Sequence, residues 1–327
     1  MQIDQNSRNN LLQLSLRKLQ FKILKYTVLG SLPNHFKNLL EQAIVYSSKT
    51  KELNFLHSRV NGLVLPSFVP EEQVRICSTF KTRPGDVFLI TYPKAGTLWL
   101  SEIVYRITKP KKPSVNLLGG AVPFFETASH EELEALPSPR YIFTHLPLSL
   151  ILRSNEHDVK YIYLARNPRD VAVSFFHFMR SVRVCDFEGT WDEFLDYFMN
   201  GEVPYGSYFD HVLEWWEHKD DENVLFLKYE VLKKELKGQV KIIAEFLGIQ
   251  LSDEEANTIA EQCTFQAMKA NPGIRADALS KMYKKGSHLR KGMVGDWQNY
   301  FSDEQLAEFQ KLYQYRMQQS GLEFEFH

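Results

Sequence analysis

Short apolar runs alternate with longer segments of helical periodicity from about residue 65 onward. The short runs are rich in β-branched and aromatic residues, as buried parallel strands are. They are Val87–Thr91, Tyr141–His145, Tyr161–Ala165 and Val224–Lys228. Helical segments follow three of them, namely Leu98–Ile107, Arg169–Arg180 and Lys234–Leu247. This alternation predicts an α/β fold with a central parallel sheet flanked by helices, and ligands at the carboxyl ends of its strands.

The first 50 residues follow a different pattern. No acidic residue occurs between Asp4 and Glu41, whereas six basic residues do, and Leu12, Leu16, Leu19 and Ile23 are spaced as on one helix face. An amphipathic basic helix could bind a membrane surface or a partner. A segment of this kind is more often an accessory helix that packs on the domain, or a poorly ordered extension. We interpret residues 1–50 as a basic N-terminal extension, helical or partly disordered, and residues 51–327 as one domain.

Composition narrows the class of protein. The 327 residues are 44% hydrophobic and 24% charged with a formal net charge of −1, which is ordinary for a globular protein and does not favour a nucleic-acid partner. Three widely spaced cysteines without a C-x-x-C pair indicate reduced thiols. No apolar run approaches the length of a membrane span, and no secretory signal is evident. We therefore expect a cytoplasmic protein without stable membrane insertion.

The segment Thr91–Trp99, with the sequence T-Y-P-K-A-G-T-L-W, lies between the first predicted strand and helix. A turn with lysine and glycine before a helix is typical of an anion site, because free N–H groups at the helix start and the lysine charge both attract an anion. A Walker A loop would place the lysine after the glycine, and here it comes before. The sequence therefore predicts a phosphate-like ligand and disfavours a nucleotide kinase that uses Mg-ATP.

Two further segments could bind an anion. Arg166 follows the third predicted strand, and Ser174 lies about two helical turns later. The guanidinium of Arg166 can donate two parallel hydrogen bonds to a phosphate, and the hydroxyl of Ser174 adds an uncharged donor. The segment Arg290–Trp297, R-K-G-M-V-G-D-W, combines two cations with two glycines. Taken alone, each is more often a charged surface segment.

Together these segments resemble the cytosolic sulfotransferases over roughly residues 60–327. Their T-Y-P-K-S-G-T-x-W motif is similar to Thr91–Trp99, and their R-K-G-x-x-G-D-W motif to Arg290–Trp297. Further matches are Thr144–Pro147, Ala165–Asn167, Asp170–Ser174, Gly201–Gly206, Glu214–Trp216 and Lys269–Pro272. The resemblance implies that residues 51–327 form a sulfotransferase domain with a P-loop-like strand–loop–helix. It also implies transfer of a sulfuryl group from 3′-phosphoadenosine-5′-phosphosulfate (PAPS), which becomes PAP, to a hydroxyl or amine of a small acceptor.

The resemblance also implies the residues that bind PAPS. The loop residues are Lys94, Ala95, Gly96, Thr97, Leu98 and Trp99. The 3′-phosphate would be held by Arg166, Ser174, Arg290, Lys291 and Gly292, and the adenosine contacted by Tyr229, Cys263, Thr264, Phe265 and Met268. A donor with two anionic ends needs two anion sites, and the sequence supplies two.

The same resemblance implies the catalytic residues. His145 would be the general base for an in-line displacement, and Lys94 would stabilise charge on the leaving phosphate. Phe124, Phe143, Phe178 and Tyr205 would line an apolar pocket suited to an aromatic or steroid-like acceptor. We expect no metal site, since His211, Glu214 and His218 lack a complete metal-binding signature.

Three departures from the family pattern stand out. Phe143 replaces a lysine that many relatives carry two residues before the histidine, and Ala95 replaces a serine. The family dimer motif K-x-x-x-T-V-x-x-x-E aligns with a segment in which Gln298, Ser302-Asp303 and Ala307 stand at the conserved positions. We therefore expect a monomer or an altered dimer. Phe143 and Ala95 also leave open an alternative, a PAPS-binding protein with weak or no catalysis.

Overall fold

A computed structural model describes residues 55, 57–69, 71–109, 121–151, 158–183, 185–275, 283–284 and 289–327. The predicted N-terminal extension, residues 1–50, lies outside the described residues. No helix in the described ranges is both long enough and apolar enough to cross a membrane.

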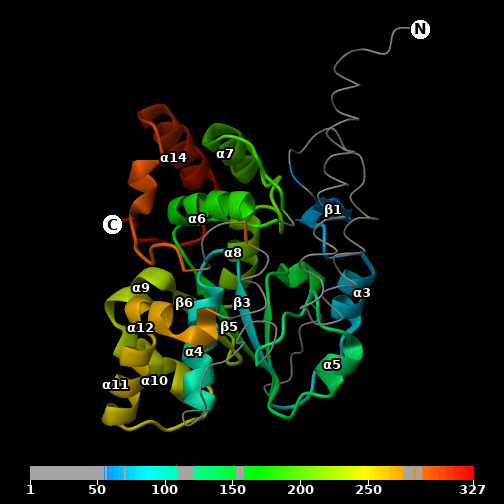
Figure 1. Ribbon diagram of the computed structural model, residues 1–327, viewed down its shortest axis with the longest axis vertical. Helices are drawn as coiled ribbons and strands as arrows, with labels where there is room; N and C mark the ends of the chain where they lie inside the picture. Colours follow the sequence, from blue (N-terminus) through cyan, green and yellow to red (C-terminus); the bar gives the residue numbers. More distant parts are fainter. Residues whose placement is uncertain are drawn as a thin grey trace, which may run out of the picture.

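Four parallel strands form the central sheet (Figure 1). Their order is β4 (Tyr141–Thr144), β3 (Val87–Thr91), β5 (Lys160–Ala165) and β6 (Val224–Lys228). The predicted parallel sheet is therefore confirmed. β4 ends one residue earlier than predicted, so that His145 lies just beyond the sheet rather than in it.

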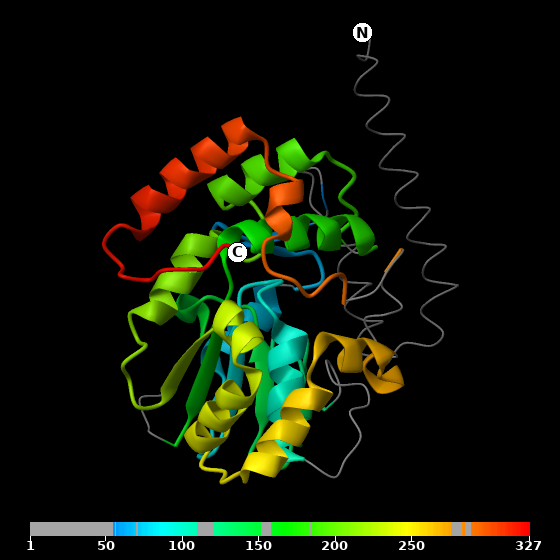
Figure 2. The same cartoon turned by 90° about the vertical axis from the view of Figure 1, so that its left-hand side faces the viewer.

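Helices cover both faces of the sheet because the strand residues alternate between two apolar clusters. Val87, Leu89 and Ile162 pack toward α4 (Thr97–Thr108), α10 (Leu236–Phe246) and α11 (Asp253–Gln262), which Figure 2 shows in cyan and yellow in front of the strands. Phe88 and Tyr161 belong to the other cluster. Helices that contribute residues to it are α3 (Glu71–Thr79), α6 (Pro168–Ser181), α7 (Trp191–Asn200), α8 (Tyr208–Trp216) and α14 (Asp303–Met317).

Shorter helices complete the described fold. They are α5 (His130–Glu134), η2 (Leu148–Leu150), α9 (Tyr229–Lys234), α12 (Phe265–Ala270), α13 (Pro272–Arg275) and η4 (Asp296–Asn299).

The helix predicted over Lys234–Leu247 is wrong at its start. Two helices, α9 and α10, occupy this region, and Glu235 between them has the non-helical angles φ −128° and ψ 44°. α9 packs against β6, whereas α10 packs against α4 and α11. One straight helix could not meet both surfaces, so tertiary packing overrides the continuous helical pattern.

An antiparallel hairpin of β1 (His57–Val60) and β2 (Leu63–Pro66) precedes the sheet and was not predicted. Its turn is Asn61-Gly62, with φ angles of +51° and +84°. An Asn-Gly pair favours such a turn because both of its positions readily take positive φ angles. The hairpin carries the chain to Pro66 and Phe68, which line the cavity described next.

Candidate active site

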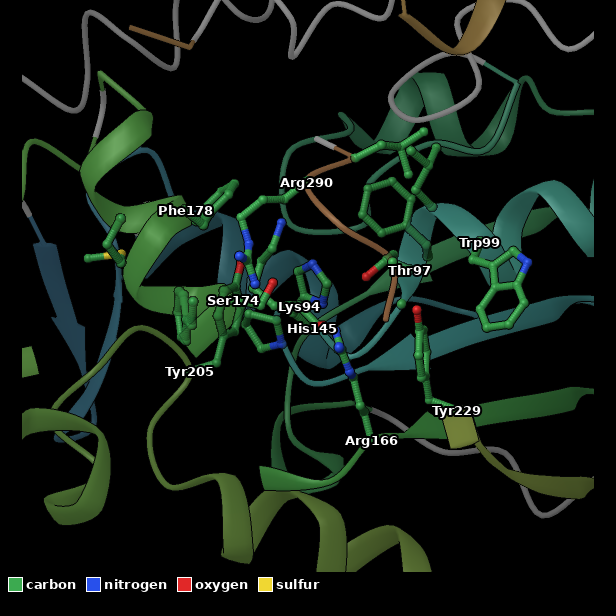
Figure 3. Close-up of a pocket in the computed structure, with 18 of the residues that line it drawn as sticks. Lys94, Thr97, Trp99, His145, Arg166, Ser174, Phe178, Tyr205, Tyr229 and Arg290 are labelled. Carbon is green, nitrogen blue, oxygen red and sulfur yellow. Dashed lines mark hydrogen bonds between the residues drawn. The ribbon is translucent and has the colours of Figure 1, made fainter. Parts of the chain in front are cut away.

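A cavity of about 190 Å³ opens at the carboxyl ends of the sheet strands, and Figure 3 shows the side chains around it. Each strand leads directly into a lining residue. The turn after β3 carries Lys94, β4 is followed by His145, β5 by Arg166 and β6 by Tyr229. Parallel strands end at the same edge, so the sheet brings together residues that are far apart in the sequence.

The turn after β3 leads into the start of α4, where the sequence predicts an anion site. Lys94 and Gly96 have φ angles of +71° and +126°. No side chain caps the helix, so its first N–H groups remain available to an anion. A Cβ atom at Gly96 would lie 3.0 Å from Leu164 Cδ2 and 3.1 Å from Tyr229 Cδ2, which explains why a glycine stands here.

Lys94 is partly exposed to the cavity, and its ammonium lies 4.4 Å from the centre of the Phe178 ring. Burial, followed by repulsion from Arg166 and Arg290, lowers the pKa of Lys94 to about 7. The neighbouring Ala95 is fully buried in the core. Phe178, predicted for the acceptor pocket, is therefore also the aromatic neighbour of the lysine.

Arg166 joins this turn to the loop that contains Met293, which belongs to the second predicted anion site. Its guanidinium donates to the carbonyls of Lys94 at 3.4 Å and Met293 at 2.8 Å, and lies 4.4 Å from the centre of the Tyr229 ring. These contacts hold the 289–293 loop against the β3 turn. Lys94 and Arg290, which belong to the two predicted anion sites and lie about 200 residues apart in the sequence, thus line one cavity.

The R-K-G loop is held by a carboxylate and by close packing. Asp296 accepts from Lys291 Nζ at 2.6 Å and forms an ion pair with Arg290 at 2.6 Å. Gly292 has a φ of +62°, and a Cβ atom there would lie 2.1 Å from Cδ2 of Phe265. Only a residue without a side chain lets the backbone approach this ring.

His145 is partly exposed and surrounded by aromatic rings. Phe124 and Phe143 stack with centroids 4.6 Å apart, and the imidazole lies 5.5 Å and 5.9 Å from them and 5.4 Å from Tyr205. His145 Nδ1 is 2.7 Å from the Thr91 carbonyl, which can only accept. Nδ1 therefore carries the hydrogen, and Nε2 is the basic nitrogen. Burial is the main reason that the pKa of His145 falls to about 3.

Most of the predicted site residues line this cavity. They are Lys94, Gly96, Thr97, Leu98, Trp99, Phe124, Phe143, His145, Arg166, Ser174, Phe178, Tyr205, Tyr229, Phe265, Met268, Arg290, Lys291 and Gly292. Ala95 packs in the core, and the exposed Thr264 caps α12. Cys263 is buried and accepts from Trp99 Nε1 through its carbonyl at 2.8 Å, so it acts on the site through its backbone.

Sequence reasoning missed several lining residues. They are Pro66, Phe68, Pro93, Thr127, Phe175, Met179, Cys185, Pro204, Lys233, Leu289 and Met293. The sequence could have predicted Lys233, because it follows Tyr229 by four residues on α9 and helical spacing places both on one face. Among the described residues, no group of three or more His, Cys, Asp or Glu side chains could hold a metal ion. The expectation of a metal-free site stays a prediction.

Comparison with known proteins identifies the class of enzyme. The family profile described as "Sulfotransferase domain" matches residues 84–321. Sulfotransferase 1B1 of Mus musculus is 41% identical over 259 residues, which span 75% of this chain and 87% of that protein. Sulfotransferase 1E1 of Homo sapiens is 39% identical over 258 residues, 75% of this chain and 88% of that protein. The chain therefore belongs to the sulfotransferase family, and it is a sulfotransferase.

Solved structures agree with this assignment. Mouse sulfotransferase SULT7A1, complexed with PAP, aligns with a TM-score of 0.70 and 36% identity over 81% of this chain and 95% of that one. Retinol dehydratase, in complex with androsterone and inactive cofactor PAP, aligns with a TM-score of 0.74 and 26% identity over 89% of this chain and 96% of that one. The α/β fold and the family predicted from the sequence are confirmed.

Proposed function

We propose that this sulfotransferase transfers a sulfuryl group from PAPS to a hydroxyl or amine of a small acceptor. PAPS is the co-substrate. The observation that carries this assignment is the pairing of two anion sites in one cavity, the uncapped start of α4 with Lys94 and the cations Arg166 and Arg290. The relatives SULT7A1 and retinol dehydratase, each solved with PAP, support it.

The glycines fit such a donor. Gly96 and Gly292 keep two parts of the wall free of side chains, and the free N–H groups of α4 suit a phosphosulfate. At the other end, Arg166, Ser174 and Arg290 offer charged and neutral donors to a 3′-phosphate. Trp99 and Tyr229, with ring centroids 4.9 Å apart, provide an aromatic surface for the adenine. Tyr229, Phe265 and Met268 contact the adenosine.

His145 is the general base of the proposed reaction. Its Nε2 takes the proton of the acceptor as the acceptor oxygen or nitrogen bonds to sulfur and the bond from sulfur to the phosphate oxygen breaks. Lys94 stabilises the charge that develops on that oxygen. The negative charge of a bound donor favours the imidazolium, so it raises the low pKa of His145 toward a useful range.

The acceptor is a neutral aromatic or steroid-like molecule. Phe124, Phe143, Phe178 and Tyr205 form the apolar end of the cavity, joined by Phe68 and Met179. Flat apolar molecules gain most from contact with such rings. The charged lining residues Lys94, Arg166, Lys233, Arg290 and Lys291 belong to the donor end, where they serve PAPS.

One observation favours a second candidate, a PAPS-binding protein with weak or no catalysis. Phe143 is buried in the stack with Phe124, where many relatives carry a lysine. The stabilisation of charge on the transferred group therefore rests mainly on Lys94 in this chain.

Transfer of radiolabelled sulfate from PAPS to a panel of phenols, alcohols and amines tests the proposal. Wild-type enzyme should label at least one acceptor, and His145→Ala should lose about 10²–10⁴-fold in turnover while it still binds PAP. PAP binding without labelling of any acceptor would favour the second candidate. Near-normal turnover by His145→Ala would exclude the base role.

We also propose that residues 51–327 act as one domain in the cytoplasm, and that residues 1–50 are an extension to it. Three unpaired, buried cysteines support a reducing compartment. The altered dimer motif at Gln298, Ser302, Asp303 and Ala307 favours a monomer or an altered dimer. Sedimentation of the full chain measures this directly.

A further inference from the structure

The backbone of His145 is held by two buried side chains from distant parts of the chain. Its N–H donates to Glu126 Oε1 at 2.7 Å, and its carbonyl lies 3.0 Å from Nε2 of His211. Its ring is held separately, by the Thr91 carbonyl at 2.7 Å from Nδ1. We call Thr91, Glu126 and His211 the His145 support.

His211 has one consistent protonation pattern. A carbonyl can only accept, so Nε2 must carry the hydrogen that faces the His145 carbonyl. Nδ1 then accepts from the Tyr163 hydroxyl, which lies 2.8 Å away. His211 is buried, and burial lowers its pKa to about 4, so the ring keeps this neutral form at neutral pH. Tyr163 on β5 and His211 on α8 thus fix the carbonyl of His145 after β4.

Glu126 holds the other side of the same peptide. It is completely buried, and burial raises its pKa to about 8. The cost of burying a carboxyl group is reduced at Oε1 by the hydrogen bond from the His145 N–H, whereas Oε2 has no hydrogen-bond partner among the described residues. A leucine or methionine would fill the space without these costs, so the position calls for an explanation beyond packing.

We propose that Glu126 and His211 are positioning residues, which hold the His145 peptide so that the Nδ1–H donates to Thr91 and Nε2 faces the acceptor. This inference rests on the proposed base role of His145 and extends it. β4 ends at Thr144, so the regular hydrogen bonds of the sheet stop one residue before the base. The side chains of Glu126 and His211 instead form hydrogen bonds with the N–H and the carbonyl of His145, which lie beyond the end of the strand.

Such positioning matters because proton transfer needs the two heavy atoms within hydrogen-bond reach. A misplacement of about 1 Å can cost about 10²-fold in rate. Neither Glu126 nor His211 lines the cavity, so their loss should reduce kcat and leave donor binding intact.

The test compares paired variants at each position. His211→Gln keeps a donor near the place of Nε2, and Glu126→Gln keeps an acceptor oxygen, whereas His211→Leu and Glu126→Leu remove them. We expect kcat to fall about 10–100-fold in the leucine variants, with PAP Kd changed less than about threefold, and the glutamine variants to recover much of the loss. His57→Leu is the matched control, because His57 is also buried and bonds the Phe55 carbonyl, but does not line the cavity.

Leucine variants that bind PAP and turn over at the wild-type rate would overturn the proposal. A leucine variant that does not fold is replaced by Tyr163→Phe, which removes only the hydroxyl that orients His211. A reduced kcat at unchanged PAP Kd then supports the proposal, and an unchanged kcat overturns it.

Two readouts separate this inference from the base role itself. If His145→Ala keeps its activity, the base role fails, whatever the supporting residues do. Imidazole ¹⁵N spectra report the tautomer of His145 without catalysis. A loss of the Nδ1–H tautomer in His211→Leu supports the role of His211, and an unchanged tautomer and ring environment counts against it.

Discussion

Replacement of Gly292 by alanine is expected to weaken PAP binding, through a contact that can be measured in the structure. A Cβ atom at Gly292 would lie 2.1 Å from Cδ2, 2.6 Å from Cε2 and 2.7 Å from Cγ of Phe265. The ring or the loop must therefore move by about 1.3 Å before the shortest contact, 2.1 Å, reaches the 3.4 Å of an ordinary contact. Both residues line the cavity, so either movement disturbs the proposed adenosine site.

The size of the effect has two parts. The φ of +62° at Gly292 costs a residue with a side chain about 1–2 kcal/mol. This cost lowers the free energy of unfolding whether or not PAP is bound. Displacement of Phe265 additionally disturbs its proposed contact with the adenosine, and the loss of an aromatic contact with a base costs about 1–3 kcal/mol. We therefore expect the PAP Kd to rise about 5–150-fold.

Gly295 provides a matched control in the same loop. Its φ is +86°, but a Cβ atom there would meet only Phe326 O at 3.6 Å and Gln298 Nε2 at 3.9 Å. Gly295→Ala should therefore show a similar loss of stability, about 1–2 kcal/mol, without the loss of PAP affinity. Urea denaturation measures the first quantity, and isothermal titration calorimetry with PAP measures the second.

Equal PAP Kd values for Gly292→Ala and Gly295→Ala would refute this reasoning, because backbone strain would then explain the whole effect. A double-mutant cycle with Phe265→Leu gives a second check. Once the ring is gone, Gly292→Ala should weaken PAP binding much less than it does in the wild-type background.

Two further predictions concern the charges of the proposed donor site. Lys233→Ala should raise the PAP Kd about two- to fivefold at low salt, since this lysine lines the cavity near Arg166, whereas the adjacent Lys234, paired with Glu325, should tolerate alanine. Equal calorimetric Kd values for the two variants would contradict this. The pKa of Lys94 near 7 has a second consequence, because only the protonated form attracts an anion. The PAP Kd should rise between pH 7 and 9, by up to about tenfold per pH unit, and Lys94→Arg should flatten this slope; a wild-type Kd independent of pH would argue against it.

The sheet strands could be predicted from local pattern, since each is a short apolar run, and the bounds of β4 and β5 differ from the prediction by one residue each. Val87–Thr91 and Val224–Lys228 were predicted with the bounds that the structure has. The helix predicted over Lys234–Leu247 includes the break at Glu235, because neither a glycine nor a proline marks that position in the sequence. The surfaces that α9 and α10 each pack against decide this break, and those surfaces come from elsewhere in the chain.

By itself, the sequence determined the α/β class and, through resemblance, the family, and it predicted an anion site in the turn at Lys94–Trp99. These depend on short segments whose chemistry and spacing are local. The tertiary structure alone decided that Phe178 would lie over Lys94, that Lys233 would reach the cavity, and that Glu126 and His211 would hold His145. The physical reason is that parallel strands bring their carboxyl ends to one edge, so contacts there join segments with no fixed spacing in the sequence.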